Sequence, residues 1–127
     1  MAEFELAIQP NVLSQSCASR RALELISEKW TALVIFALVG GPKRHADLLR
    51  MIEGVSQKML TQTLRSLAVD GLVERRVLDA PPPQHVEYRL TALGESLAGP
   101  LTELCHWAMD NLDAVQQARS ANGAPPL

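Results

Sequence analysis

Four polar side chains lie at helical spacing in the middle of the chain, and all four can donate hydrogen bonds. Lys58, Thr61, Gln62 and Arg65 stand at positions i, i+3, i+4 and i+7, so they share one face of a helix. No acidic residue interrupts this face. Arginine and lysine pair with guanine, and glutamine pairs with adenine, in the major groove of DNA. The spacing therefore predicts a surface that reads DNA bases. The alternative is the solvated face of an ordinary helical hairpin.

Two short helices joined by a tight turn are expected to present this face. The first begins at His45, and Gly54 stands where the turn needs a positive φ. Ser56 is a suitable N-cap for the second helix, which Gly71 ends. We expect its apolar side to bury Met59, Leu60, Leu64, Leu67 and Ala68. The pattern predicts a helix-turn-helix whose recognition helix spans about residues 56–70.

A β-hairpin is predicted directly after this helix pair. Residues 72–79 and 85–91 alternate between apolar and polar side chains, as strands do. Between them the run Ala-Pro-Pro-Pro-Gln forms a stiff loop that cannot pair as a strand. Helix-turn-helix followed by hairpin is a winged-helix arrangement, with a wing at about 73–91. The residues expected to contact DNA are Arg44, His45, Ser56, Gln57, Lys58, Thr61, Gln62, Arg65, Arg75, Arg76, Gln84 and His85.

The charges are unevenly distributed along the chain. The formal net charge of the 127 residues is −2, yet residues 42–76 hold seven lysines and arginines against four acidic residues. A local cationic patch on an acidic body favours one binding face over indiscriminate attraction to polyanions.

The remaining segments are predicted to form the core and an interface. An irregular arm at 1–13 precedes a first helix, capped by Ser16 and running to about Ser27, whose inner face is Ala18, Ala22, Leu25 and Ile26. Residues 30–39 are apolar nearly all round and predict a core helix buried on every side, with Trp30 and Leu33 in its inner stripe. Thr91 caps a further helix that Gly99 and Pro100 are expected to interrupt.

A long amphipathic helix follows at about 101–118, and a disordered tail at 119–127 ends the chain. The apolar residues of this region are Leu97, Leu101, Leu104, Cys105, Ala108, Leu112 and Val115. A second copy of the chain is the simplest cover for such a stripe, and packing within its own domain of about 14–118 is the alternative.

Two cysteines in a chain of this size do not make a disulfide framework, so we expect a reducing cytosol. Cys17 lies at the start of a helix with Arg20 and Arg21 within one turn, where the macrodipole favours a thiolate. A redox-sensing thiol and a buried structural cysteine at a dimer contact are both consistent with this position. Cys105 falls in the apolar stripe, which favours an inert thiol.

Several classes of protein are disfavoured. The three histidines are scattered, without cysteines or carboxylates at ligand spacing, so we expect no metal site and no cofactor. Phosphate-binding glycine loops, nucleophile elbows and paired catalytic carboxylates are missing from the sequence, which disfavours an enzyme. No apolar run reaches the roughly 18 residues of a membrane span, and the N-terminus lacks a signal-peptide pattern. We therefore expect a cytoplasmic protein.

Several motifs together resemble those of the HxlR-type branch of the MarR-like winged-helix transcription regulators. These are the Lys-Trp-Thr at 29–31, the Gly-Pro at 41–42, the stretch SQKMLTQTLRSLAVDGLVER and the VEYRLT after the wing. The resemblance covers residues 17 to about 112. It implies a mainly α (α+β) winged helix-turn-helix fold with N- and C-terminal dimerisation helices, acting as a homodimer on a palindromic operator. Several members of that family sense oxidants or electrophiles through a cysteine at the position of Cys17. Many relatives have proline after this cysteine, whereas this chain has Ala18.

Two other functions remain open on the sequence. One is a winged helix used only for protein contacts, because a fold does not dictate function. The other is a regulator without a thiol switch that binds a small-molecule effector in a pocket near the dimer interface. The low aromatic content of 4% gives little support to an aromatic-ligand pocket.

Overall fold

A computed structural model of the protein describes residues 13–78 and 85–127. Residues 1–12 of the arm predicted at 1–13, and the wing tip at 79–84 with Gln84, lie outside the described residues. The elements in chain order are α2 (Ala18–Ile26), α3 (Thr31–Leu38), β1 (Lys43–Arg44), α4 (His45–Met51), α5 (Gln57–Val69), β2 (Val73–Leu78), β3 (His85–Leu90) and α6 (Ala92–Ala121). This is the mainly α winged-helix class expected from the sequence.

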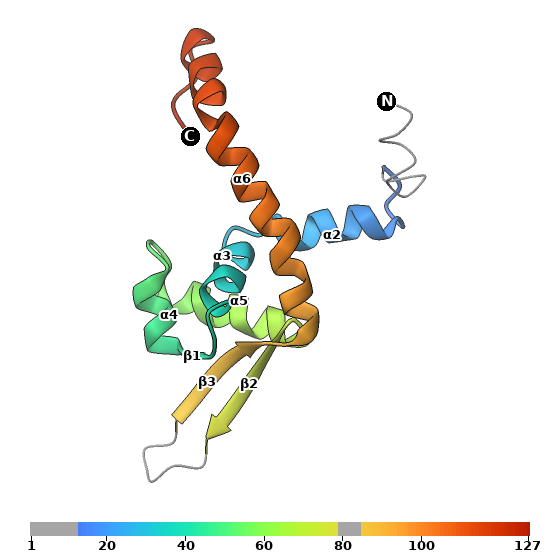
Figure 1. Ribbon diagram of the computed structural model, residues 1–127, viewed down its shortest axis with the longest axis vertical. Coiled ribbons are helices and arrows are strands. Elements are labelled where there is room, and N and C mark those ends of the chain that lie inside the picture. Colours follow the sequence, from blue (N-terminus) through green and yellow to red (C-terminus); the bar gives the residue numbers. More distant parts are fainter. Residues whose placement is uncertain (1–12, 79–84) are drawn as a thin grey trace.

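The helices enclose a core beside a three-stranded antiparallel sheet of order β1-β3-β2. The hairpin β2–β3 projects from one end of the molecule, and the C-terminal half of α6 extends beyond the other end (Figure 1). A short strand, β1, precedes the helix pair, and its Lys43 and Arg44 lie opposite Tyr88 and Glu87. Val34, Ile35, Leu48, Leu60 and Leu64 form the centre of the core, each at most 1% exposed.

Helix α3 supplies much of this core but is not buried on all sides, as its composition had suggested. Thr31, Val34, Ile35 and Leu38 are buried, whereas Leu33 is 43% exposed. Among residues 13–78 and 85–127, the neighbouring elements leave the Leu33 side of α3 open, so uniform apolarity does not mean uniform burial. Trp30 is half-buried and lies beside the helix-turn-helix. Its ring is close to Gly54, where an added Cβ would lie 3.7 Å from it. This supports a packing role for the tryptophan.

The first helix differs from its predicted start. Cys17, not Ser16, occupies the N-cap position of α2, and no side chain caps the helix there. The hydroxyl of Ser16 instead lies 3.0 Å from that of Ser14. No residue of α2 is fully buried; Leu25 and Ile26 pack partly against the core, while Ala18 and Ala22 are exposed. Helix α2 is therefore held less tightly than the other helices.

Helix α6 is continuous over 30 residues, which corrects the predicted interruption at Pro100. Proline removes one backbone donor and crowds the residue before it, but Gly99 has no Cβ to be crowded. The hydroxyl of Thr91 caps the helix as expected, accepting from the amide of Gly94 at 3.1 Å. It also donates to the carbonyl of Gly71 at 2.6 Å, which fastens the start of α6 to the end of the helix-turn-helix.

The C-terminal residues also depart from the expected disordered tail. Helix α6 runs to Ala121 rather than 118, and the chain then folds back along it. The side chain of Arg119 donates to the carbonyl of Pro125 at 2.7 Å, and the amide of Leu127 donates to Gln116 at 3.1 Å. Local hydrogen bonds thus order a segment whose composition is typical of disorder.

Candidate nucleic-acid interface

The turn of the helix-turn-helix follows the expected chemistry. Gly54 has a φ of 87°, which a glycine adopts without strain. The hydroxyl of Ser56 accepts from the amide of Met59 at 3.1 Å and so caps α5. Gly71, with a φ of 75°, follows the C-cap of the same helix. These local interactions fix where the recognition helix begins and ends.

Helix α5 buries a narrower face than predicted. Leu60, Thr63, Leu64 and Leu67 are buried, whereas Met59 is 39% exposed and Ala68 is exposed as well. At about 100° per residue, Met59 and Ala68 lie a quarter turn from the centre of the buried stripe. Their apolar character therefore did not place them in the core.

The opposite face of α5 is exposed and contains no acidic side chain. Five of the residues predicted to contact DNA line one shallow depression of about 500 Å³ on this face: Gln57, Lys58, Thr61, Gln62 and Arg65. The helix itself has no aspartate or glutamate between its ends. Its hydrogen-bonding potential is thus directed outward over a surface with net positive charge.

Two predicted contact residues are bonded to each other across the helix pair. Nε2 of His45, at the start of α4, lies 3.0 Å from the hydroxyl of Thr61 on α5. The neighbouring Asp47 accepts from the amide of Arg44 at 3.1 Å and from the side chain of Arg50 at 2.6 Å. The His45–Thr61 bond links the start of α4 to the exposed face of α5, and the Asp47 bonds order the start of α4 itself.

The two faces of the wing carry different charges. Arg75 lies opposite Tyr88 in the hairpin and lines a cleft with residues of α5, so its face is turned toward the recognition helix. Arg76 lies opposite Glu87 on the other face, and β1 places Arg44 beside the same glutamate. His85 stands opposite Leu78, next to the segment outside the described residues.

Glu74 neutralises part of the outer wing face. Its carboxylate accepts from both Nε and Nη2 of Arg89, at 3.2 and 2.9 Å. The same carboxylate lies 3.8 Å from Nε of Arg76. The strand register explains this ion pair: Glu74 and Arg89 lie directly opposite each other, so their side chains share one face of the hairpin.

The two cysteines lie in different surroundings. Cys17 is partly exposed and Cys105 is exposed in the single chain. That Cys105 is an inert thiol in the apolar stripe stays a prediction. The side chain of Arg20 donates to the carbonyl of Leu13 at 2.6 Å and lies 3.6 Å from Glu24. Of the two arginines expected beside Cys17, Arg20 is thus engaged elsewhere.

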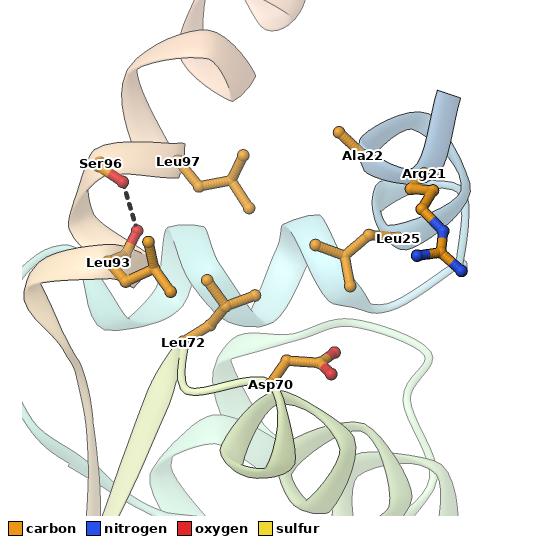
Figure 2. Close-up of a pocket in the computed structure, with 8 residues that line it drawn as sticks. All are labelled: Arg21, Ala22, Leu25, Asp70, Leu72, Leu93, Ser96 and Leu97. Atoms are coloured by element: carbon orange, nitrogen blue, oxygen red, sulfur yellow. Dashed lines mark hydrogen bonds between the residues drawn. The ribbon is translucent and has the colours of Figure 1, made fainter. Parts of the chain in front are cut away.

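An apolar groove of about 470 Å³ lies between α2, the end of α5 and the base of α6 (Figure 2). Its walls come mainly from leucines, with Arg21 and Asp70 at one side and the hydroxyl of Ser96 bonded to the carbonyl of Leu93 at 2.6 Å. The full lining is Arg21, Ala22, Leu25, Asp70, Leu72, Leu93, Ser96 and Leu97. The groove thus borders one side of α2, while Leu25 and Ile26 still pack partly against the core.

Within residues 13–78 and 85–127, no group of three or more His, Cys, Asp or Glu side chains lies close enough to hold a metal ion. In the same described ranges, no helix combines the length and apolarity that a bilayer span requires.

The fold and this exposed helix define a winged helix-turn-helix DNA-binding protein. Comparison with protein families is specific: residues 25–116 match the model of the HxlR-like helix-turn-helix family, and the chain belongs to that family. It is a transcriptional regulator with a helix-turn-helix DNA-binding domain.

Three similar proteins illustrate the relationship. The uncharacterized HTH-type transcriptional regulator YkvN of Bacillus subtilis is 49% identical over 72% of this chain and 77% of its own. The uncharacterized HTH-type transcriptional regulator YtfH of Escherichia coli is 40% identical over 90% of both chains. The redox regulator HypR in its reduced form superposes with a TM-score of 0.73 at 31% identity, covering 78% of this chain and 97% of HypR. These relatives are regulators rather than enzymes.

Proposed function

We propose that the protein is a homodimeric repressor or activator that recognises a palindromic operator through α5. One observation carries the proposal: α5 presents Gln57, Lys58, Thr61, Gln62 and Arg65 on one exposed, acid-free face. Lys58, Thr61 and Gln62 read base edges in the major groove. Arg44, His45, Ser56, Gln57, Arg75, Arg76, Gln84 and His85 bind sugar and phosphate around them.

A mobility-shift assay on the DNA upstream of the protein's own gene tests this function. We expect binding that survives excess random competitor DNA and weakens steeply as salt increases, because phosphate contacts release counterions. A triple variant Lys58→Ala, Thr61→Ala, Gln62→Ala is expected to bind the operator no better than random DNA. Binding by wild type that random competitor abolishes entirely would contradict a sequence-specific function.

We further propose dimerisation through the C-terminal half of α6. Leu104 and Trp107 are 56% and 54% exposed in the single chain, and Met109 is 81% exposed. Exposed apolar side chains gathered on one protruding helix favour a protein interface. Trp107 and Met109 lie on nearly opposite sides of the helix, so the exposed apolar surface is wider than the stripe predicted from the sequence.

Redox control through Cys17 is the proposed form of regulation. A thiolate at this position attacks a hydroperoxide, forming a sulfenic acid and releasing water or an alcohol; a second thiol then displaces water to give a disulfide. Cys105 or Cys17 of the partner subunit supplies that thiol. The solved relative HypR is named a redox regulator, and structures of its reduced and oxidised forms both resemble this chain.

Cys17→Ser tests the switch, and Cys105→Ser identifies the second thiol. Loss of the diamide response in Cys105→Ser would assign that thiol to Cys105, and a retained response would assign it to Cys17 of the partner subunit. Diamide is expected to change the operator affinity of wild type but not of Cys17→Ser, because only wild type forms the disulfide. Non-reducing gels report that bond directly. An operator affinity of wild type that diamide leaves unchanged would assign Cys17 to packing alone.

The groove of Figure 2 favours a second candidate regulation, by a small apolar effector without a thiol switch. Its volume of about 470 Å³ lies within the range of small-molecule sites, and it touches the end of the recognition helix. Ala22→Phe would fill the groove. If the groove binds an effector, thermal shifts seen with a panel of apolar acids and phenols should disappear in this variant.

A further inference from the structure

A small cleft separates the recognition helix from the wing. Its volume is about 160 Å³, and Thr61, Leu64, Arg65, Ala68, Arg75 and Tyr88 line it. Leu64 is buried and Tyr88 is half-buried, so the floor is apolar. The two arginines reach the same cleft from different elements, one from α5 and the other from β2.

These two arginines differ from their neighbours in having no protein partner among the described residues. Arg50 and Arg89 donate to carboxylates at 2.6 and 2.9 Å, whereas neither Arg65 nor Arg75 forms a hydrogen bond or ion pair there. None of the described residues that line the cleft is acidic. Both arginines are solvent-exposed, and an anion bound between two such cations forms charge-assisted hydrogen bonds to both.

We propose that this cleft binds one sugar–phosphate unit of the operator strand. The phosphate lies between the guanidinium groups of Arg65 and Arg75, and the carbon face of the deoxyribose covers Ala68 and Tyr88. This rests on the proposed function and assigns Arg65 a backbone contact, in place of the guanine contact predicted from its spacing. A base edge has no net charge, whereas a phosphodiester offers oxygens to two cations at once.

The position of the cleft fits such a contact. A strand that borders the groove occupied by α5 must pass between this helix and the wing. One phosphate held from both sides would fix the angle between recognition helix and hairpin. The clamp thereby sets the register in which Thr61 and Gln62 meet the bases.

Operators with a single methylphosphonate at each successive phosphate test the assignment, since this group removes one charge at nearly constant shape. For wild type we expect one position per half-site where affinity falls about tenfold or more, as loss of a charge-assisted hydrogen bond requires. At that position the methylphosphonate should weaken binding by Arg65→Ala and Arg75→Ala little further, because these variants have already lost the contact. In Arg75→Lys, which keeps a cation there, part of the methylphosphonate penalty should return. Arg119→Ala carries the same change in net charge at the end of α6 and should keep the full wild-type penalty.

The clamp is overturned if, at every phosphate, the loss of affinity from the methylphosphonate adds in full to the loss from Arg65→Ala and to that from Arg75→Ala. So would an Arg65→Ala loss that disappears when one guanine of the operator is replaced by another base. Inorganic phosphate, compared with chloride at equal ionic strength, should not compete selectively; selective competition would indicate a site for a free anion instead. Failure of wild type to prefer any operator would refute the proposed function, which is a different outcome from these.

Discussion

Gln62 is the residue whose surroundings best suit base reading. It lies on the exposed face of α5 and has no hydrogen-bond partner among the described residues. Its amide can donate and accept at once, which matches the major-groove edge of adenine. Gln62→Ala should weaken operator binding by about 1–3 kcal/mol and leave random DNA almost unchanged.

A competition titration with both DNAs measures this difference. Gln116→Ala, on α6, removes the same chemical group far from the recognition helix and serves as control. Equal losses of affinity for operator and random DNA would mean that Gln62 contacts the DNA backbone rather than a base.

Glu74 limits the positive charge that the wing presents. Its carboxylate accepts from Arg89 at 2.9 Å and lies 3.8 Å from Arg76. Glu74→Gln preserves the shape and releases both arginines, so binding to every DNA sequence should tighten. The slope of log affinity against log salt should steepen by about one for each further phosphate that the released arginines bind.

Glu103→Gln makes the same charge change on α6 and should leave the slope unaltered. Weaker DNA binding by Glu74→Gln would mean that the ion pair holds Arg89 or Arg76 in its binding position.

Side-chain partners were the feature that residue-level reasoning could least foresee. The polar face of α5 followed from spacing alone, and the structure places Lys58, Thr61, Gln62 and Arg65 together as predicted. The bond from His45 to Thr61 joins residues sixteen positions apart. Such contacts depend on how two helices cross, which local periodicity does not determine.

At the scale of elements, Thr91 joins the helix-turn-helix to α6. Its hydroxyl donates to Gly71 at 2.6 Å and accepts from Gly94 at 3.1 Å. At Gly94 an added Cβ would clash with the carbonyl of Leu72, so the two segments pack closely there. Thr91→Val keeps the shape, loses both bonds and should lower the free energy of unfolding by about 1–2 kcal/mol.

Urea denaturation followed by circular dichroism measures the loss. Thr91→Ser retains the hydroxyl and should stay close to wild type. If Thr91→Ser loses more stability than Thr91→Val, the methyl group rather than the hydrogen bonds stabilises this junction.

Element boundaries followed the sequence where capping residues act locally, as at Ser56 and Thr91. They did not follow it at Pro100, because a single lost hydrogen bond is small beside the remaining bonds of a 30-residue helix. Burial cannot be predicted from local sequence either. Leu33 of α3 is apolar yet 43% exposed, because its burial depends on which other elements pack against that side of the helix.

At the scale of the whole molecule, the stripe on α6 divides into two parts. Leu101 is 2% exposed and belongs to the core, whereas Leu104 and Leu112 are 56% and 39% exposed on the protruding half. The chain's own core cannot cover both parts, because α6 extends beyond it (Figure 1). The exposed part is the expected seam with a second copy, which would bring two recognition helices to one DNA duplex.

Leu112→Glu tests this assembly without disturbing the single chain, where the residue is partly solvent-exposed. In the dimer the glutamate would be buried, at a cost of several kcal/mol. We expect sedimentation at micromolar concentration to give the mass of one chain for the variant and of two chains for wild type, with unchanged helical content. Gln117→Glu adds the same charge on the opposite side of α6 and should remain dimeric.

The monomeric variant should lose the preference for half-sites spaced about one helical turn apart, because only a two-fold protein reads both at once. A Leu112→Glu protein that still sediments as two chains would exclude this interface and with it the predicted half-site spacing.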